Sequence, residues 1–385
     1  MKSFAILLAV ITLSFVPGKQ IEPLNGRPAF ATRVSDHKTL PLGSQAPPFS
    51  LPATDGKIYS LASFNKAKIL VIVFTCNHCP TAQAYEDRII KLTKDYLSKG
   101  VALIAIMPND PVSVNLDELG YSDMGDSFAE MKRRAKEKNF NFPYLYDGEN
   151  EKVSLAYGPI ATPHIFIFDN KRILRYSGRI DDMEKPTATP TEHNARVAID
   201  ELLTDKPVTT PVTKVFGCSV KWEDKSNWIE KSTAAWAKEP VVLDTINEQQ
   251  IHELIQNKSG KLRLINVWAT WCGPCVTEFG EFISINRMYR KRDFEFVSIS
   301  ADDMTKEKNA LEFLQHQQAS GKNYIFSGAN RYKLIEAVDP NWQGALPYTL
   351  LVEPGGKIVY AKEGIIDPAE LKLKIVDNKY IGRYF

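Results

Sequence analysis

The 385-residue chain has few cysteines, almost no net charge and no late apolar run long enough to span a membrane. Five cysteines in a chain of this length do not make the dense disulfide framework of a small secreted domain. A net charge of +2 gives no basis for a nucleic-acid partner or a polybasic membrane surface, and we expect neither. These absences leave a globular protein with enough residues for two hydrophobic cores.

Residues 1–17 have the pattern of a secretory signal peptide. Lys2 supplies the basic end, and the apolar stretch Phe4–Val16 is shorter than the roughly 20 residues that a membrane span requires. No clear small-residue cleavage site follows, so an uncleaved anchor is the alternative. We expect a periplasmic or otherwise exported protein without stable membrane insertion after signal removal.

The strongest chemical signal is the stretch 262–275, which reads LRLINVWATWCGPC. The sequence pattern predicts a buried strand at Leu262–Val267 and a helix at Cys275–Arg290. The C-x-x-C pair therefore lies where a strand meets a helix. Unpaired N–H groups and the helix dipole favour negative charge there, and the thiolate is the nucleophile of disulfide exchange. We therefore predict Cys272 as nucleophile and Cys275 as its resolving partner.

A similar junction occurs earlier in the chain. The apolar run Ile69–Phe74 precedes Cys76-Asn-His-Cys79-Pro. His78 between the two sulfurs is expected to stabilise the Cys76 thiolate and to make this pair the more oxidising one. The recurrence of strand, dithiol and helix about half a chain apart predicts an internal duplication of architecture.

Alternating strand and helix patterns predict an α/β fold with two domains, each a central mixed sheet flanked by helices. We place the first domain at 40–205, a domain tail and linker at 206–240, and the second domain at 241–385. Further buried strands are expected at Val101–Met107 and Phe294–Ser300. The other helices are predicted at Pro80–Leu97, Ser127–Lys138, Thr191–Leu203, Asp244–Gln256, Lys306–Gln317 and Pro368–Val376.

Both halves resemble known thioredoxin-like families. The second half resembles TlpA/ResA-type thioredoxins in Trp271–Cys275, in Glu278 and in the Leu346-Pro347 loop. The first half resembles peroxiredoxin-like redoxins of the AhpC/TSA type, in Phe74–Pro80, Ala84–Arg88 and Thr162–Asp169. The resemblance implies two thioredoxin-like domains and thiol-disulfide oxidoreductase activity without a cofactor. It also implies disulfide-containing client proteins and an upstream thiol electron donor, which we expect to be membrane-bound.

The resemblance also implies roles for residues outside the dithiols. Pro163 and Pro347 match the cis-proline loop that packs against the C-x-x-C pair, and Pro347 would leave the neighbouring backbone open to pair with a substrate strand. Thioredoxins have a buried Asp six residues before the leading cysteine, where this chain has Asn266. Glu278 is therefore the expected proton relay, with a solvated first-turn Glu as the alternative. Trp271, His78 and His164 are expected to line the substrate site.

Two rival functions follow from the first dithiol. A thiol peroxidase would use Cys76 and Cys79, although peroxidases hold a Thr or Ser three residues before the reactive cysteine and this chain has Cys76 there. A copper or zinc delivery protein would use Cys76, Cys79 and His164, with His78 a further ligand. We expect no bound metal. The lone Cys218 is interpreted as a buried apolar residue, with a third redox thiol as the alternative.

Overall fold

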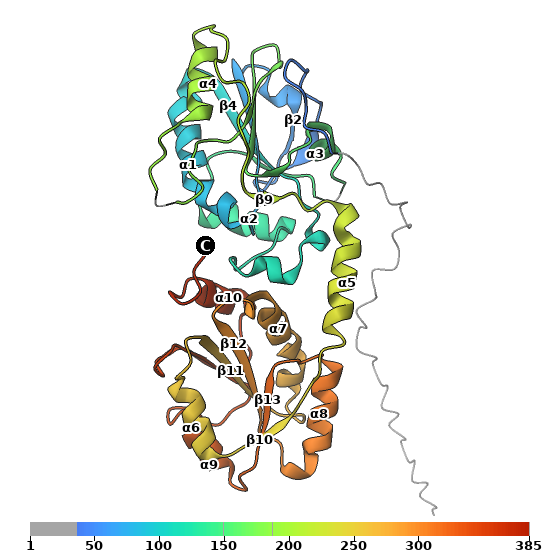
Figure 1. Cartoon of the computed structure of the whole chain (residues 1–385), viewed down its shortest axis with the longest axis vertical. Helices are drawn as coiled ribbons and strands as arrows, with labels where there is room; N and C mark the ends of the chain where they lie inside the picture. The colour runs from blue at the N-terminus through green and yellow to red at the C-terminus, as the bar shows by residue number, and fades with distance from the viewer. Residues whose placement is uncertain (1–36, 149, 187, 385) are drawn as a thin grey trace, which may run out of the picture. The chain divides into compact units, whose positions relative to one another are not determined.

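The computed structural model describes residues 37–148, 150–186 and 188–384, so the predicted signal peptide lies outside the described residues. In these ranges no helix has the length and apolar character needed to cross a bilayer. Two separate mixed sheets carry the architecture (Figure 1). The expected α/β fold class, two mixed sheets flanked by helices, is therefore confirmed.

The first sheet has five strands in the order β5-β4-β3-β7-β8. The central strand β3 runs parallel to β4 and antiparallel to β7. A short hairpin of β1 and β2 precedes the sheet. The strands are β1 (Ser50–Pro52), β2 (Ile58–Ser60), β3 (Ile69–Phe74), β4 (Val101–Met107), β5 (Tyr144–Tyr146), β7 (His164–Phe168) and β8 (Leu174–Gly178).

The second sheet has six strands in the order β10-β13-β12-β11-β14-β15. Its central strand β11 is parallel to β12 and antiparallel to β14, so it repeats the first sheet's pattern with one more strand, β10, at the edge. The sequence therefore encodes one architecture twice. The strands are β10 (Asp244–Ile246), β11 (Leu262–Trp268), β12 (Phe294–Ser300), β13 (Lys322–Phe326), β14 (Tyr348–Val352) and β15 (Ile358–Glu363).

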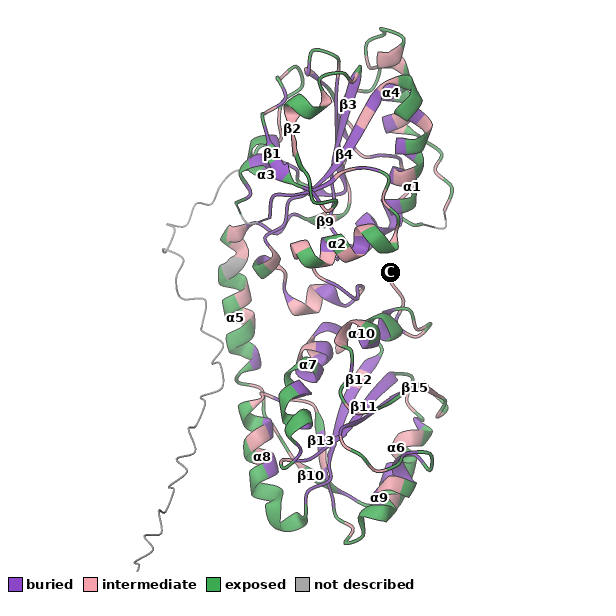
Figure 2. Ribbon diagram, turned by 180° about the vertical axis from the view of Figure 1, so that it is seen from behind, coloured by how far each residue is buried: buried purple, intermediate pink, exposed green. Residues whose placement is uncertain are grey.

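Period-two alternation gives the first sheet a hydrophobic core on each face. Ile69, Val71 and Val73 face α1 and α4, whereas the intervening residues of β3 face α3 and the β1 strand. Both views show α1 and α4 beside each other along this sheet (Figures 1 and 2). The helices of this half are α1 (Pro80–Tyr96), α2 (Phe128–Glu137), α3 (Lys152–Tyr157) and α4 (Asn194–Leu203).

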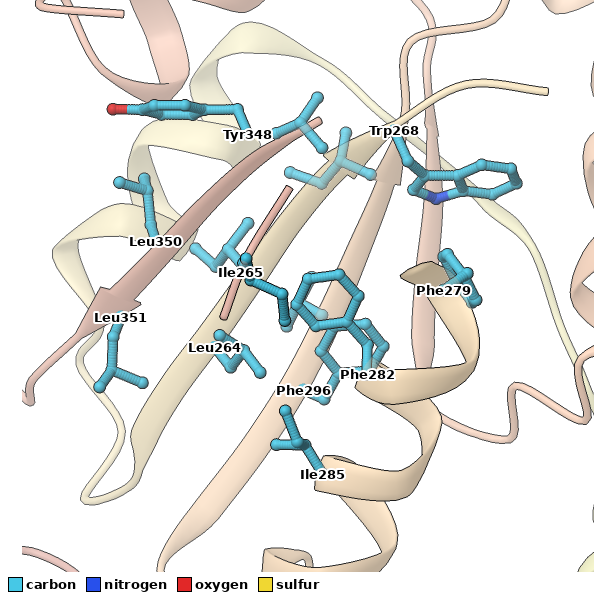
Figure 3. Close-up of a cluster of buried hydrophobic side chains, with 14 of the residues drawn as sticks. Leu264, Ile265, Trp268, Phe279, Phe282, Ile285, Phe296, Tyr348, Leu350 and Leu351 are labelled. Carbon is cyan, nitrogen blue, oxygen red and sulfur yellow. The ribbon is translucent and has the colours of Figure 1, made fainter. Parts of the chain in front are cut away.

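The second sheet packs against the long helix that follows its dithiol. Figure 3 shows Phe282 and Ile285 of this helix, α7, directed toward the sheet. The Phe282 ring stacks on Phe296 with centroids 5.6 Å apart, and Phe279 meets Trp268 edge to face at 5.0 Å. This packing fixes the helix start against the end of β11. The helices are α6 (Glu248–Gln256), α7 (Gly273–Tyr289), α8 (Glu307–His316), α9 (Arg331–Val338) and α10 (Pro368–Val376).

Two sequence-based helix starts are wrong, and two elements were not predicted. The predicted helix Asp244–Gln256 begins only at Glu248, because Asn247 caps it and residues 244–246 form edge strand β10. Helix α4 begins at Asn194 rather than Thr191, whose side chain instead bonds to Asp182. Strand β13 and helix α9 were not predicted.

The segment predicted as tail and linker contains two ordered elements. Helix α5 (Ser226–Trp236) follows a short strand β9 (Cys218–Ser219), which pairs antiparallel with β6 (Ala161–Thr162) directly before Pro163. The approach is close at Gly217, which has φ +138°, and a Cβ there would lie 2.1 Å from the Thr162 carbonyl oxygen. Only glycine fits this position without displacing backbone.

We predict that Gly217→Ala lowers the free energy of unfolding by about 2 kcal/mol or more, because the methyl group meets backbone rather than a flexible side chain. Denaturant unfolding of the full chain measures the loss. Gly260→Ala is the matched control, because a Cβ at Gly260 meets no atom within 4 Å. Equal unfolding midpoints for the two variants would contradict the close approach of β9 to β6.

Candidate active site

The second dithiol is a disulfide at the N-terminus of α7. Cys272 and Cys275 are bonded with an S–S distance of 2.04 Å. Cys272 is the N-cap residue of the helix, and the Cys275 N–H donates to its sulfur over 3.3 Å. The helix N-terminus therefore faces Cys272, the sulfur that the sequence assigns as nucleophile, and favours its thiolate after reduction.

The residues around this disulfide differ in their exposure to solvent. Trp271 is 58% exposed, and the Arg331 guanidinium lies over its ring at 5.0 Å from the centroid. Cys272 retains 6% exposure, whereas Cys275 is buried at 1%. An exposed ring thus directly precedes the outer sulfur, which is suitable for contact with a protein client.

Glu278 lies one helical turn after Cys275 and is buried. Its Oε2 accepts a hydrogen bond from the Ile366 N–H at 3.0 Å, while Oε1 has no protein partner. Burial raises the pKa of this carboxyl, only partly offset by the Ile366 hydrogen bond. Asn266, at the position expected for a buried Asp, donates to Thr349 Oγ1 and offers no ionisable group. Glu278 is therefore a buried acid on the helix that begins at the second dithiol.

Both loop prolines follow cis peptide bonds, at Thr162-Pro163 and Leu346-Pro347. In the first half this loop contacts the dithiol directly. Cys76 Sγ lies 3.1 Å from Thr162 Oγ1, and Cys79 Sγ lies 3.4 Å from the Thr162 carbonyl oxygen. In the second half, Leu346 packs against the cluster that contains Cys272 and Cys275.

The first dithiol is placed differently from the second with respect to its helix. Here the second cysteine, Cys79, is the N-cap residue, and its sulfur accepts from the Ala82 N–H at 3.5 Å. Burial opposes a thiolate, yet hydrogen bonds from the Cys218 and Cys76 thiols and the nearby His78 hold the pKa of Cys79 well below its usual value. Burial raises the pKa of Cys76. The expectation that His78 stabilises a Cys76 thiolate is therefore wrong: the stabilised sulfur is Cys79.

His78 forms a buried pair with Asp126. His78 Nδ1 lies 2.6 Å from Asp126 Oδ2, and the Asn77 and His78 N–H groups both donate to Asp126 Oδ1. Burial favours neutral imidazole, but the Asp126 carboxylate outweighs it and raises the pKa of His78. Sequence reasoning missed Asp126, which is 48 residues from His78 in the chain and belongs to no motif.

The proposed metal set is only partly brought together. Cys76, His78 and Asp126 each offer a ligand atom within 4.8 Å of the others. Asp126 Oδ2 is already bonded to His78 and to Asn109 Nδ2 at 2.7 Å, so these atoms form an ion pair with hydrogen bonds rather than an open ligand set.

His164 lies on β7, and its ring is engaged elsewhere. Its Nε2 lies 3.0 Å from Ser177 Oγ, and its Nδ1 accepts from the Ile160 N–H at 3.4 Å. Burial lowers the pKa of His164 to about 3, so the ring is neutral. The described contacts do not join it to the first dithiol.

Two protein families match the two halves of the chain. Residues 42–177 match the AhpC/TSA family, and residues 233–378 match the redoxin family. Thioredoxin from Ophiophagus hannah is 33% identical over 89 residues, which cover 22% of this chain and 83% of that protein. Thiol-disulfide oxidoreductase ResA from Bacillus subtilis (strain 168) is 24% identical over 123 residues, covering 32% of this chain. The chain spans 63% of the length of this ResA, less than two thirds.

Solved structures also resemble part of the chain. A hypothetical protein from Sinorhizobium meliloti 1021 is 31% identical, with 48% of this chain and 96% of that chain covered and a TM-score of 0.42. An uncharacterized conserved protein from Geobacillus kaustophilus is 36% identical, with 48% and 93% covered and the same TM-score.

We predict that Asp126→Asn raises the pKa of Cys79, because it removes the carboxylate that raises the pKa of His78, and the positive charge of His78 is one of the causes that lower the pKa of Cys79. The ultraviolet absorbance of the thiolate, titrated with Cys272 and Cys275 changed to Ser, reports this shift. Asp169→Asn, at a carboxyl that accepts from the Arg175 guanidinium, is the control. An unchanged titration in Asp126→Asn would show that His78 does not stabilise the thiolate.

The same variant should lose stability in a defined pH window. The pKa of Asp126 is lowered, chiefly by His78 against the effect of burial, so its contribution is lost as pH falls below its ordinary 3.8 through the folded value. The pKa of His78 is raised, so its contribution is complete below 6.5 and lost as pH rises through its folded value. The deficit of Asp126→Asn, about 3 kcal/mol, should therefore be largest between pH 3.8 and 6.5 in unfolding curves. A deficit independent of pH would argue against the ion pair.

Proposed function

The chain belongs to the thioredoxin family, with an AhpC/TSA-type half and a redoxin-type half in tandem, and on this premise we propose that it is a thiol-disulfide oxidoreductase acting on client proteins. The single observation that carries the proposal is the Cys272–Cys275 disulfide at the start of α7, with Cys272 as the capping residue. A ready redox couple is thus held where a helix stabilises the attacking thiolate.

The proposed cycle uses both sulfurs of this couple. In the reduced protein the Cys272 thiolate attacks a client disulfide, forming a mixed disulfide and releasing one client thiolate. The Cys275 thiol then loses its proton and attacks Cys272, which reforms the intramolecular disulfide and releases the second client thiolate. Two electrons pass to the client, and an upstream thiol donor returns two electrons to the couple.

Glu278 is the proposed proton acceptor for the second step. Cys275 is buried, so its proton needs a nearby base that water does not readily provide. Glu278 is buried on the same helix with one oxygen unpaired, and the raised pKa brings its carboxyl closer to neutral working pH. We assign it to the deprotonation of Cys275 during resolution.

Two observations bear on the rival functions. A thiol peroxidase at the first dithiol would be favoured by the stabilised Cys79 thiolate and the AhpC/TSA match, yet Cys79 has no exposed surface. Metal delivery would require His164 to leave Ser177 and join the first dithiol. Disulfide exchange requires no such rearrangement, and we retain it.

The proposed location is outside the cytoplasm. It rests on the signal-like pattern of residues 1–17, with a donor on the membrane side as the expected source of electrons.

We predict that Cys272→Ser abolishes reduction of insulin disulfides in the presence of a thiol donor, because no nucleophile remains at the helix N-terminus. Turbidity from the released insulin chains measures it. Cys275→Ser should instead accumulate mixed disulfides with clients, visible as adducts on non-reducing gels. Cys76→Ser, at the first dithiol, is the control variant and should retain insulin reduction by the second dithiol. Full insulin reduction by Cys272→Ser would refute the assignment of the nucleophile.

We predict that Glu278→Gln slows resolution of the mixed disulfide by about a hundredfold at neutral pH, within the range of general base catalysis. Stopped-flow release of a fluorescent peptide thiol measures this step, and the pH dependence of the rate should lose its Glu278 inflection. Glu281→Gln, an exposed residue on the same helix, is the matched control. A wild-type rate and pH profile in Glu278→Gln would assign the carboxyl a purely structural role.

A further inference from the structure

Three thiols of the first half gather around Thr162. Cys76 and Cys79 contact its hydroxyl and carbonyl oxygens, at 3.1 and 3.4 Å. Cys218 lies directly opposite Thr162 in the β6–β9 pair and packs against the hydrophobic cluster that contains Cys76 and Cys79. The three cysteines are therefore brought together at Thr162, two from the C-x-x-C motif and one from strand β9.

The three thiols differ in their access to solvent. Cys76 is 2% exposed and Cys79 is 0% exposed, whereas Cys218 is partly exposed. An external disulfide must reach a sulfur atom along the S–S axis to react. Among these three thiols, Cys218 is the one that offers surface for that approach.

We propose that Cys218 is the outer thiol of the first half, which attacks an external disulfide and passes the oxidation inward to Cys79 and then to Cys76. The inference rests on the proposed function only in assuming thiol-disulfide exchange, and it concerns sulfurs that the cycle at Cys272 does not use.

Each step conserves atoms and electrons. Cys218 attacks the external disulfide, gives its proton to Cys79, and releases one external thiolate. Cys79 then passes that proton to the released external thiolate and, as a thiolate, attacks Cys218, which forms a Cys79–Cys218 disulfide and releases the second external thiolate. Cys76 next loses its proton to the departing Cys218 sulfur and attacks Cys79, which leaves a Cys76–Cys79 disulfide and returns Cys218 to its thiol. The external disulfide is reduced by two electrons, and the buried dithiol is oxidised by two.

The hydrogen bonds around Cys79 suit the proton transfer in the first step. As a thiolate, Cys79 accepts from the Ala82 N–H at 3.5 Å. As a thiol, it has the Thr162 carbonyl oxygen at 3.4 Å as acceptor. The proton can thus move from Cys218 to Cys79 while both charge states of Cys79 keep hydrogen-bond partners.

Strand β9 also occupies an informative place. It pairs with the backbone directly before the cis-proline, which is where the open edge in the second half is expected to receive a substrate strand. Cys218 is thus presented to Cys79 as the cysteine of a paired client strand would be. Gly217 permits the close backbone contact that this requires.

The first test uses the full chain with Cys272→Ser and Cys275→Ser, so that only the first half reacts, and oxidised glutathione as the disulfide. We expect Cys218→Ser to slow formation of the Cys76–Cys79 disulfide by about tenfold or more, because the attacking thiolate loses its access. Ser219→Ala, next to Cys218 on β9, is the matched control with the wild-type rate. Equal rates in Cys218→Ser and Ser219→Ala would overturn the proposal.

The second test does not depend on Cys218→Ser folding. In the same background, Cys76→Ser removes the final partner, so oxidised glutathione should trap Cys79 in a disulfide with Cys218. Mass spectrometry of non-reduced peptides identifies the linkage, and its absence would overturn the proposal. Because Cys272 and Cys275 are missing, either result is independent of insulin reduction by the second dithiol.

Discussion

Backbone N–H groups at the start of a helix, directed at a sulfur atom, are the interaction on which both dithiols depend. In the second half these groups face Cys272, the first cysteine of its motif. In the first half they face Cys79, the second cysteine of its motif. The same C-x-x-C spacing therefore stabilises the leading sulfur in one half and the following sulfur in the other.

The position of one proline explains this difference, and the sequence contains it. Pro80 is the first residue of α1, where its missing N–H costs no hydrogen bond, so Cys79 becomes the cap. In the second motif the proline lies between the cysteines, in the first turn of α7, and the helix starts directly after Cys272. The two motifs are therefore not equivalent, and the thiolate that was expected at Cys76 is stabilised at Cys79 instead.

Local sequence patterns predicted much of the fold. They could not predict which residues far apart in the chain become partners in the site. The apolar runs predicted the bounds of β3 and β11 to within one residue. A central strand is buried on both faces, so its sequence is a continuous apolar run that is easily recognised. The two prolines located the cis bonds through the family resemblance. Asp126 and Cys218 have no periodic pattern, and their roles arise only when the fold brings them to His78 and Cys79.

The two halves solve the problem of sulfur access in opposite ways. Around the second dithiol an exposed Trp271 adjoins a slightly exposed Cys272, so a client can approach from outside. Around the first, β9 covers the strand edge at the cis-proline, and burying His78 requires the Asp126 charge and its hydrogen bonds to compensate lost solvation. Because β9 covers this site, an external disulfide can reach the buried Cys76 and Cys79 only through a thiol that β9 itself provides. The thiol on the covering strand is consequently the feature that keeps a buried dithiol chemically connected to its surroundings.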